Sequence, residues 1–170
     1  MSAYLRTMGA AALLAWTGAA SAQEFDALSW HVTFYDLNET TREVTLTFGV
    51  PETDWVMASS SCRSGMRLKD FPINLALGGV LDLDAVNNGD AVTFAFDPDF
   101  FEAGYEAVAQ VPESGEGLYG VVIETTPGDD LWNAMKTSDE MRYTVNGEVM
   151  TLPLKGSFHA VAEFLRLCVY

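Results

Sequence analysis

The 170-residue chain is short of basic residues, histidine and cysteine. It has nine Lys and Arg against 24 Asp and Glu, two His and two Cys, and its formal net charge is −15. A surface of this charge repels phosphate backbones and anionic lipid, so nucleic-acid binding is disfavoured. Because 49% of the residues are hydrophobic and the acids are spread along the chain, the composition indicates a folded acidic domain rather than a disordered one.

Long hydrophobic runs are also scarce, and the longest lies near the N-terminus. Residues 8–18 are apolar, Arg6 precedes them, and Ala20-Ser21-Ala22 follows. This order is typical of a secretory signal peptide over residues 1–22, cleaved between Ala22 and Gln23. The run is shorter than the roughly 20 residues of a membrane-spanning helix. The sequence therefore predicts one periplasmic or secreted domain over residues 23–170, without stable membrane insertion.

The predicted compartment determines how the two cysteines, Cys62 and Cys168, are interpreted. In an oxidising space, two cysteines of one small domain usually form a disulfide. A metal site would require further Cys or His ligands at suitable spacing, which neither cysteine has, and a catalytic thiol is the third alternative. A disulfide that closes a loop of about 100 residues would stabilise the fold by up to about 4.7 kcal/mol.

Alternating apolar and polar residues predict a chain made mainly of β-strands. The segments 29–35 and 43–48 are expected to form an antiparallel pair with one face in water. Residues 59–65 have the composition of a loop, although Cys62 can still belong to an extension of the preceding strand. Asn146-Gly147 predicts a tight hairpin. Further strands are predicted over residues 55–59, 91–96, 105–111, 118–125, 141–145 and 149–154, with shorter apolar segments at 71–77 and 81–83.

Two helices complete the prediction. Asp129 or Asp130 is expected to cap a short helix near residues 130–136, and Ser157 is expected to cap a C-terminal helix. In that second helix a buried stripe is formed by Val161, Phe164, Leu165 and Cys168. The predicted fold class is mainly β: an antiparallel β-sandwich-like single domain with both helices.

The residues that most often carry chemistry lack a supporting context. His31 is predicted on the polar face of the first strand, and His159 lies four residues before Glu163 on the last helix, where such a pair is usually a solvated contact. The chain has neither a G-x-S-x-G nor an S-x-x-K motif. The sequence therefore predicts no catalytic residue and no cofactor.

Acidic and aromatic residues suggest few sites. The acidic segment 82–90 does not match the EF-hand register, and Asp97-Pro98-Asp99 has the composition of a loop, so no metal site is predicted. A looser calcium site at Asp97-Pro98-Asp99 is the less favoured alternative. Most aromatic residues fall on strand faces, and Phe34 is among those expected in the core. If a ligand groove exists, Phe100-Phe101 and Trp55 are its candidates, although packing is the favoured interpretation.

Two segments carry a resemblance to other proteins. The first is Leu46-Thr47-Phe48-Gly49-Val50-Pro51-Glu52-Thr53-Asp54 followed by Cys62; the second is Val145-Asn146-Gly147, Leu152-Pro153-Leu154-Lys155-Gly156-Ser157, then Ala160, Phe164, Leu165 and Cys168. Together they resemble small secreted proteins of Gram-negative bacteria, which have no assigned activity. The resemblance covers about a third of the chain. It implies a periplasmic location and pairing of the two cysteines, and it implies no catalytic residue.

These observations favour a non-enzymatic domain that binds an unidentified protein or cell-envelope component, such as an inhibitor whose acidic face meets a basic enzyme. The alternative is a hydrolase of envelope polymers that uses two carboxylates. A carrier of a small ligand is a third hypothesis, which requires a cavity.

Overall fold

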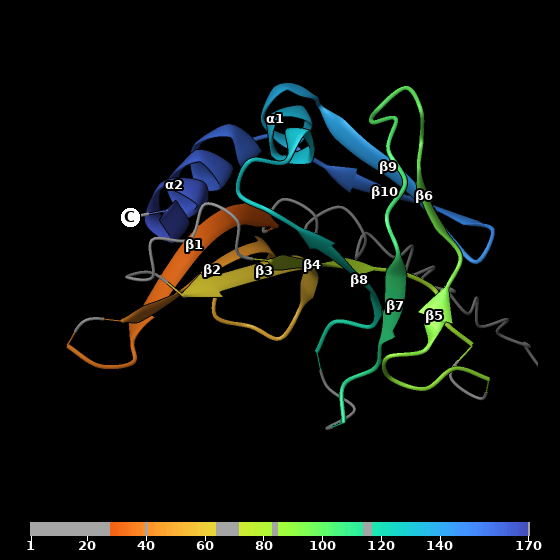
Figure 1. Ribbon diagram of the computed structural model, residues 1–170, viewed down its shortest axis with the longest axis horizontal. Coiled ribbons are helices and arrows are strands. Elements are labelled where there is room, and N and C mark those ends of the chain that lie inside the picture. The colour runs from red at the N-terminus through yellow and green to blue at the C-terminus, as the bar shows by residue number, and fades with distance from the viewer. Residues whose placement is uncertain (1–27, 40, 64–71, 83–84, 114–116, 170) are drawn as a thin grey trace, which may run out of the picture.

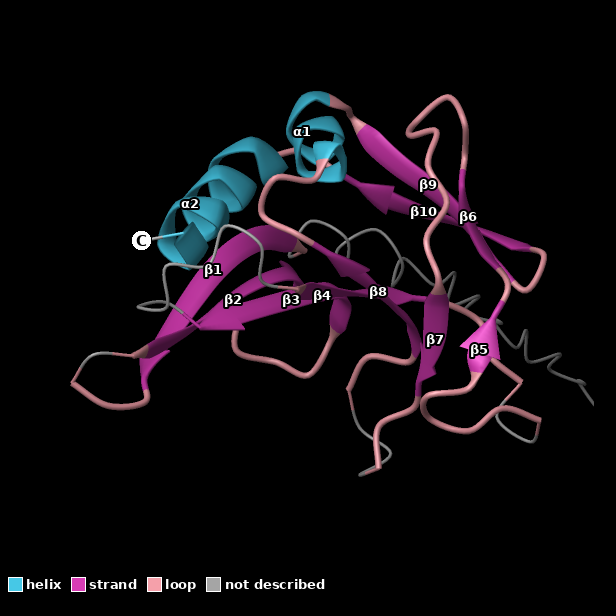
Figure 2. Ribbon diagram, viewed as in Figure 1, coloured by secondary structure: helices cyan, strands magenta, loops and turns pink. Residues whose placement is uncertain are grey.

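The computed structural model describes residues 28–39, 41–63, 72–82, 85–113 and 117–169, which form two antiparallel sheets and two helices (Figures 1 and 2). The large sheet has seven strands in the order β1-β2-β3-β4-β8-β7-β5, and the small sheet has three in the order β10-β9-β6. The predicted signal peptide lies outside the described residues. The elements are β1 (Ser29–Asp36), β2 (Arg42–Gly49), β3 (Val56–Arg63), β4 (Ile73–Gly78), β5 (Ala91–Val92), β6 (Phe94–Phe96), β7 (Ala107–Gln110), β8 (Gly120–Thr125), α1 (Asp130–Thr137), β9 (Glu140–Val145), β10 (Glu148–Pro153) and α2 (Ser157–Val169).

The core lies between the large sheet and a second layer made of the small sheet and both helices (Figure 1). Strands β2, β4 and β8 alternate buried and more exposed residues, as expected of a sheet with one face in water. The predicted mainly β, antiparallel fold with two helices is confirmed. Fully buried side chains from all layers meet here, among them Leu46, Leu75, Leu77, Ile123, Trp132, Met141, Leu152 and Phe164.

Helix α1 begins as predicted. The Asp129 carboxylate accepts the Leu131 N–H at 2.9 Å, so Asp129 rather than Asp130 is the cap. At the start of α2 the cap prediction was wrong. Ser157 lies within the helix and is buried, and its hydroxyl donates to the Met135 carbonyl at 2.5 Å, which ties α2 to α1. Because Met135 is far from Ser157 in sequence, no local pattern around residue 157 predicts this hydrogen bond.

Cys62 and Cys168 form the predicted disulfide, with their Cα atoms 5.8 Å apart. The bond joins β3 to the last turn of α2, whose stripe of Val161, Phe164 and Cys168 is buried as expected. The loop predicted from residue 59 onward was wrong up to Arg63, because β3 continues to that residue. Pairing with β2 and β4 overrides the weak strand preference of the serines. Residues 64 and 65 lie outside the described residues.

The strand predicted over residues 91–96 is two strands in two different sheets. β5 pairs with β7 in the large sheet, and β6 pairs with β9 in the small sheet. At Thr93, between them, the N–H donates to the Asn146 side-chain oxygen at 3.1 Å, and the carbonyl accepts the Asn146 N–H at 2.8 Å. The predicted hairpin at Asn146-Gly147 is confirmed, with positive φ angles of 49° and 91°.

The expectation that Phe34 lies in the core was wrong. It lies on the same face of β1 as buried Trp30, yet it is 56% exposed. The burial of β1 falls toward Asp36, so strand alternation alone did not predict which half of the strand the second layer covers. The Arg42 guanidinium lies over the Phe34 ring, 5.3 Å from its centroid.

Candidate functional site

A hollow of about 570 Å³ lies where the loop after β6 meets the start of β9. We call it the acidic groove. Its described lining residues come from three neighbouring parts of the fold, namely the β6–β7 connection, the end of α1 and strand β9, and they carry more negative than positive charge. They are Asp97, Asp99, Phe100, Ser138, Asp139, Glu140 and Arg142.

The loop wall of the groove is a turn held by Asp97. Its N–H donates to the Arg142 carbonyl at 2.9 Å, which joins the loop to β9. Its carboxylate accepts the Asp99 N–H at 2.9 Å, and its carbonyl accepts the N–H groups of Phe100 and Phe101, each at 2.9 Å. Asp97 therefore shapes the wall, as expected of an aspartate in a turn.

The opposite wall carries an ion pair in which Arg142 contacts Glu140 at 2.6 Å. Both side chains are about half exposed, at 53% and 45%, so the pair contributes little to stability. Asp99 and Asp139 are also exposed. Because these side chains are exposed, the groove presents negative charge to solvent.

Aromatic residues pack against one another beside the loop wall of the groove. Phe96 is buried, and its ring centroid lies 5.6 Å from that of Phe100, 6.0 Å from that of Phe101 and 5.7 Å from that of Tyr105. Phe100-Phe101 thus follows the packing interpretation, while Phe100 also lines the groove. Trp55 is 41% exposed and is not among the described residues that line the acidic groove.

The second hollow, of about 300 Å³, lies on the outer face of β1 and β2, beside the turn that follows β2. Its floor is rich in hydroxyl groups, and Glu52 at its rim has a positive φ of 63°. His31 is half-buried there and its ring Nδ1 lies 3.2 Å from the Ser29 carbonyl oxygen. The described lining residues are His31, Thr33, Tyr35, Thr45, Thr47, Val50, Glu52, Thr53, Asp54 and Val56.

His159 lies on the exposed side of α2, where its ring meets Phe158 edge-on at 5.2 Å. Glu163, four residues on, instead accepts two hydrogen bonds from Arg166, at 2.6 and 2.8 Å. These bonds hold the pKa of Glu163 below its usual range. The two histidines thus lie on different layers, one on β1 and one on α2.

The described residues offer no cluster of metal ligands. Within them, no group of three or more His, Cys, Asp or Glu side chains could hold a metal ion. In the acidic segment 82–90, the Asp90 carboxylate accepts the backbone N–H of Asn87 at 2.8 Å and its side-chain amide at 3.2 Å. These bonds form a turn, the interpretation favoured for this segment.

Comparison with known proteins finds no relative, because no protein-family model, curated protein or solved structure matches this chain. The resemblance to small secreted proteins therefore stays a prediction. Over the part of the chain that is described, no helix is long and apolar enough to cross a membrane.

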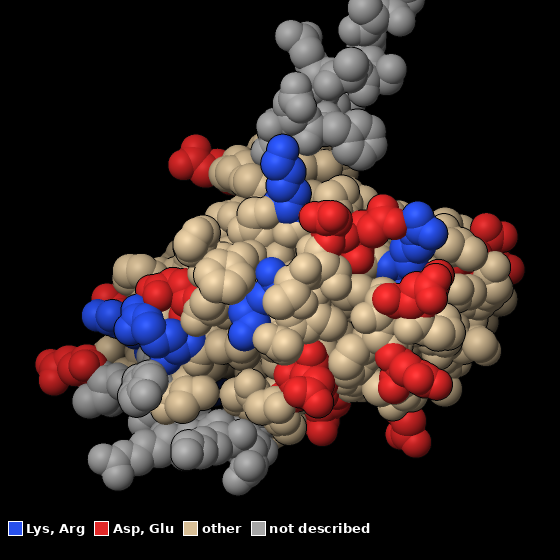
Figure 3. Space-filling model, turned by 90° about the horizontal axis from the view of Figure 1, so that it is seen from above, with Lys and Arg blue, Asp and Glu red and all other residues tan. Residues whose placement is uncertain are grey.

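Figure 3 shows the face formed by the helices and the small sheet. Several separate clusters of acidic side chains lie in the right half of this view, among other residues and with Lys or Arg atoms beside some of them. The acidic groove is a hollow lined by side chains of this kind. The sequence favoured a loop for Asp97 and Asp99, with a loose calcium site as the alternative, and no local pattern linked them to Asp139 and Glu140.

Proposed function

We propose that this protein is a non-enzymatic binding domain of the periplasm or secreted space, and that the acidic groove engages a basic partner protein or a basic cell-envelope component. One observation carries the proposal. The described lining of one hollow contains four acidic residues and one basic residue, Arg142. The acidic residues are Asp97, Asp99, Asp139 and Glu140. A concave surface of one charge sign concentrates ligands of the opposite sign and accelerates their association.

The proposed location rests on separate observations. The first 22 residues have the order of a signal peptide. The disulfide between Cys62 and Cys168 is of the kind that persists in oxidising compartments. N-terminal sequencing of protein made in a secreting Gram-negative host should find Gln23 as the first residue. A chain that keeps Met1 would contradict the location.

A carboxylate-dependent hydrolase is the second candidate for the same groove, since it also needs two acids on one hollow. It has less support, because Asp99, Asp139 and Glu140 are exposed and Glu140 is paired with Arg142. A glycosidase usually keeps one carboxylic acid protonated by burying it.

The test compares two triple variants in a pull-down from envelope extract, using oxidised protein without residues 1–22. The groove variant combines Asp99→Asn, Asp139→Asn and Glu140→Gln, and leaves Asp97 intact because it holds the turn. The control variant combines Glu106→Gln, Glu113→Gln and Glu124→Gln, three exposed acids that do not line the groove. The proposal expects the groove variant to lose the partner and the control to keep it.

The salt dependence adds a second criterion. Association through an acidic groove should slow as salt rises, because the Debye length falls from about 10 Å at 0.1 M to about 3 Å at 1 M. Equal capture by both variants would contradict the groove as the binding site. If one single substitution among these acids removed all function while binding persisted, the hydrolase would replace the binding domain as the better explanation.

A further inference from the structure

Strand β1 forms one edge of the large sheet, and it lacks the features by which edge strands usually avoid further pairing. It has eight residues, its register with β2 is continuous from Ser29 to Asp36, and it contains no Pro, Gly or Lys. Natural edges are usually protected by short length, bulges, proline or lysine.

The other edges carry such protection. β5 has two residues and β6 has three. β10 contains Pro153, which cannot donate a hydrogen bond. Among the four sheet edges in the described part of the chain, β1 alone presents a long and uninterrupted backbone.

The hydrogen-bond pattern identifies the free backbone groups of this edge. The Leu37 N–H donates to the Thr41 carbonyl at 2.9 Å, and these residues continue the register of β1 with β2. In an antiparallel pair, hydrogen-bonded and non-hydrogen-bonded residues alternate. The odd-numbered residues of β1 therefore bond to β2, whereas the N–H and carbonyl groups of the even-numbered residues point away from it. In the described part of the chain, no strand pairs with β1 on that side.

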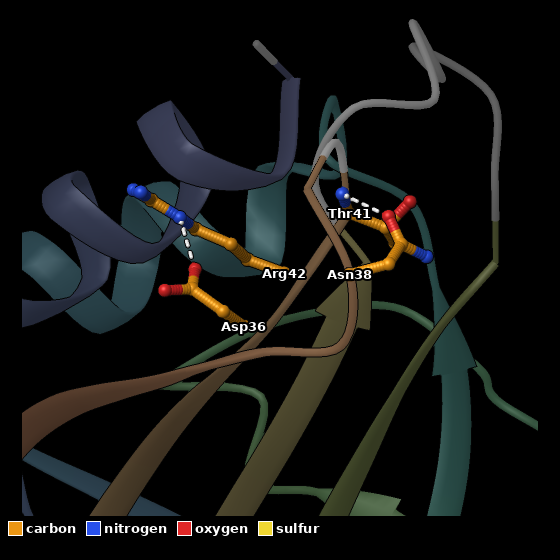
Figure 4. A network of polar contacts seen from close by, with 4 residues as sticks. All are labelled: Asp36, Asn38, Thr41 and Arg42. Atoms are coloured by element: carbon orange, nitrogen blue, oxygen red, sulfur yellow. Dashed lines mark hydrogen bonds and ion pairs between the residues drawn. The ribbon is translucent and has the colours of Figure 1, made fainter.

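The side chains and charges of β1 also favour a partner strand. Phe34 is 56% exposed although it faces the core side, so a neighbouring strand would bury it. Residues 29–35 include no Asp, Glu, Lys or Arg. Asp36, at the end of the strand, is paired with Arg42 at 2.6 Å, and in the adjoining turn Asn38 accepts the Thr41 N–H at 2.9 Å (Figure 4).

We propose that two copies of this chain pair antiparallel through β1, with the two-fold axis at Thr33, to form one continuous sheet. A copy of net charge −15 repels another, so the copies must meet where neither carries a charge, and residues 29–35 provide such a stretch. The two Asp36 carboxylates then lie at opposite ends of the paired segment. This interface is independent of the acidic groove, and it goes beyond the proposed function.

The position of the axis follows from the pleat. Residues directly opposite in a sheet share a face, so the axis must pass through a residue of β1 rather than between two. With the axis at Thr33, Val32 lies opposite the partner's Phe34, and His31 lies opposite the partner's Tyr35. This register uses the free backbone groups of every even-numbered residue from Trp30 to Asp36. An axis at Val32 would leave those of Asp36 beyond the paired strands.

The test is sedimentation equilibrium of the oxidised protein without residues 1–22, from nanomolar to high micromolar concentration. The expected result is a dimer whose dissociation constant falls as salt rises, because salt screens the repulsion between the copies. Thr33→Lys would place two ammonium groups opposite each other, and it should raise the dissociation constant by about tenfold or more. The matched control is Thr45→Lys, on the same outer face of β2 and opposite Thr33 in its own chain, which should leave the dimer unchanged.

A second variant addresses the backbone. Val32→Pro removes an N–H that points away from β2, so it should abolish the dimer while the secondary structure seen by circular dichroism is retained. A monomer at every concentration would overturn the proposal, as would a dimer that survives both Thr33→Lys and Val32→Pro. The groove variant Asp99→Asn, Asp139→Asn, Glu140→Gln should still dimerise, which separates failure of this inference from failure of the proposed function.

Discussion

The Tyr105 hydroxyl donates a hydrogen bond to the Asp129 carboxylate, with an oxygen–oxygen distance of 2.7 Å. The same carboxylate oxygen accepts the Leu131 N–H at 2.9 Å, so it serves both as the cap of α1 and as an anchor for the segment before β7. Burial, followed by the hydrogen bond and charge of Asp129 and the charge of Asp130, raises the pKa of Tyr105 above its usual range. This contact holds together the two segments that lead to the walls of the acidic groove.

Tyr105→Phe should lower the free energy of unfolding by about 1.5 kcal/mol, the typical contribution of a hydrogen bond to a charged group. The ring remains in its contact with Phe96, so the loss reports the hydroxyl. Urea unfolding measures the change. Tyr35→Phe, at a tyrosine that is 66% exposed, is the matched control and should change stability by less than about 0.5 kcal/mol. Equal effects of the two variants would contradict a structural role for the Tyr105 hydroxyl.

Tyr143 predicts how stability depends on alkaline pH. Its side chain is buried and its hydroxyl donates to the Gly78 carbonyl at 2.6 Å, and burial raises the pKa of Tyr143 above the ordinary tyrosine value of about 10. Above that value the unfolded chain loses the Tyr143 proton while the folded chain keeps it. Since the folded state then binds more protons, the free energy of unfolding must fall as pH rises from about 10.

The measurement is urea unfolding of the wild type and of Tyr143→Phe between neutral pH and pH of about 11. The variant should be less stable by about 1 kcal/mol at neutral pH, because the Gly78 carbonyl loses its donor. It should also lose less stability on going to alkaline pH. Parallel pH profiles for the two proteins would show that Tyr143 titrates alike in the folded and unfolded states.

Local patterns predicted most elements of this fold, but not the contacts that assemble them. Alternation located β1, β2, β9 and β10, and Asn146-Gly147 predicted the hairpin, because these signals lie within a few residues of one another. The division of residues 91–96 between two sheets depends on Asn146, far along the chain. The groove walls meet through the bond between Asp97 and Arg142, which no spacing in the sequence encodes.

Removing the disulfide is expected to have a large effect on stability. Cys62 and Cys168 are 106 residues apart in sequence, and breaking a native disulfide of a small secreted domain usually costs about 2–5 kcal/mol. Cys62→Ala with Cys168→Ala should lower the free energy of unfolding by that amount. Wild-type protein that is denatured without a reducing agent should have no free thiol that reacts with a thiol reagent. Two titratable thiols, or a double variant as stable as the wild type, would contradict the structural role of this bond.

The histidines are expected to be replaceable. His159 is exposed and His31 is half-buried on the outer face of the large sheet. Replacing each with Gln should change the free energy of unfolding by no more than about 0.5 kcal/mol, as for ordinary surface positions. Capture of the partner in the pull-down should be unchanged in the double variant. A variant that folds normally but captures nothing would reveal a histidine-dependent site.

The last prediction concerns Asn146, which combines a backbone role with a side-chain role. Its φ of 49° lies in the left-handed region, which Asn and Gly tolerate better than Ala. Its side-chain oxygen accepts the Thr93 N–H, at the point where the chain passes from the large sheet to the small one. Asn146→Gly keeps the backbone freedom and removes the amide, whereas Asn146→Ala removes both.

The two variants should therefore differ. Asn146→Gly should lower the free energy of unfolding by about 1 kcal/mol, for one hydrogen bond, and Asn146→Ala by a further 1–2 kcal/mol or so, for the left-handed conformation. Urea unfolding of both variants measures these changes. The control variant is Asn88→Gly. Asn88 is an exposed turn residue, and its side chain accepts the Val111 N–H at 3.1 Å. If Asn146→Ala were no worse than Asn146→Gly, the strain at this position would be negligible and only the bond to Thr93 would remain as the reason for an asparagine here.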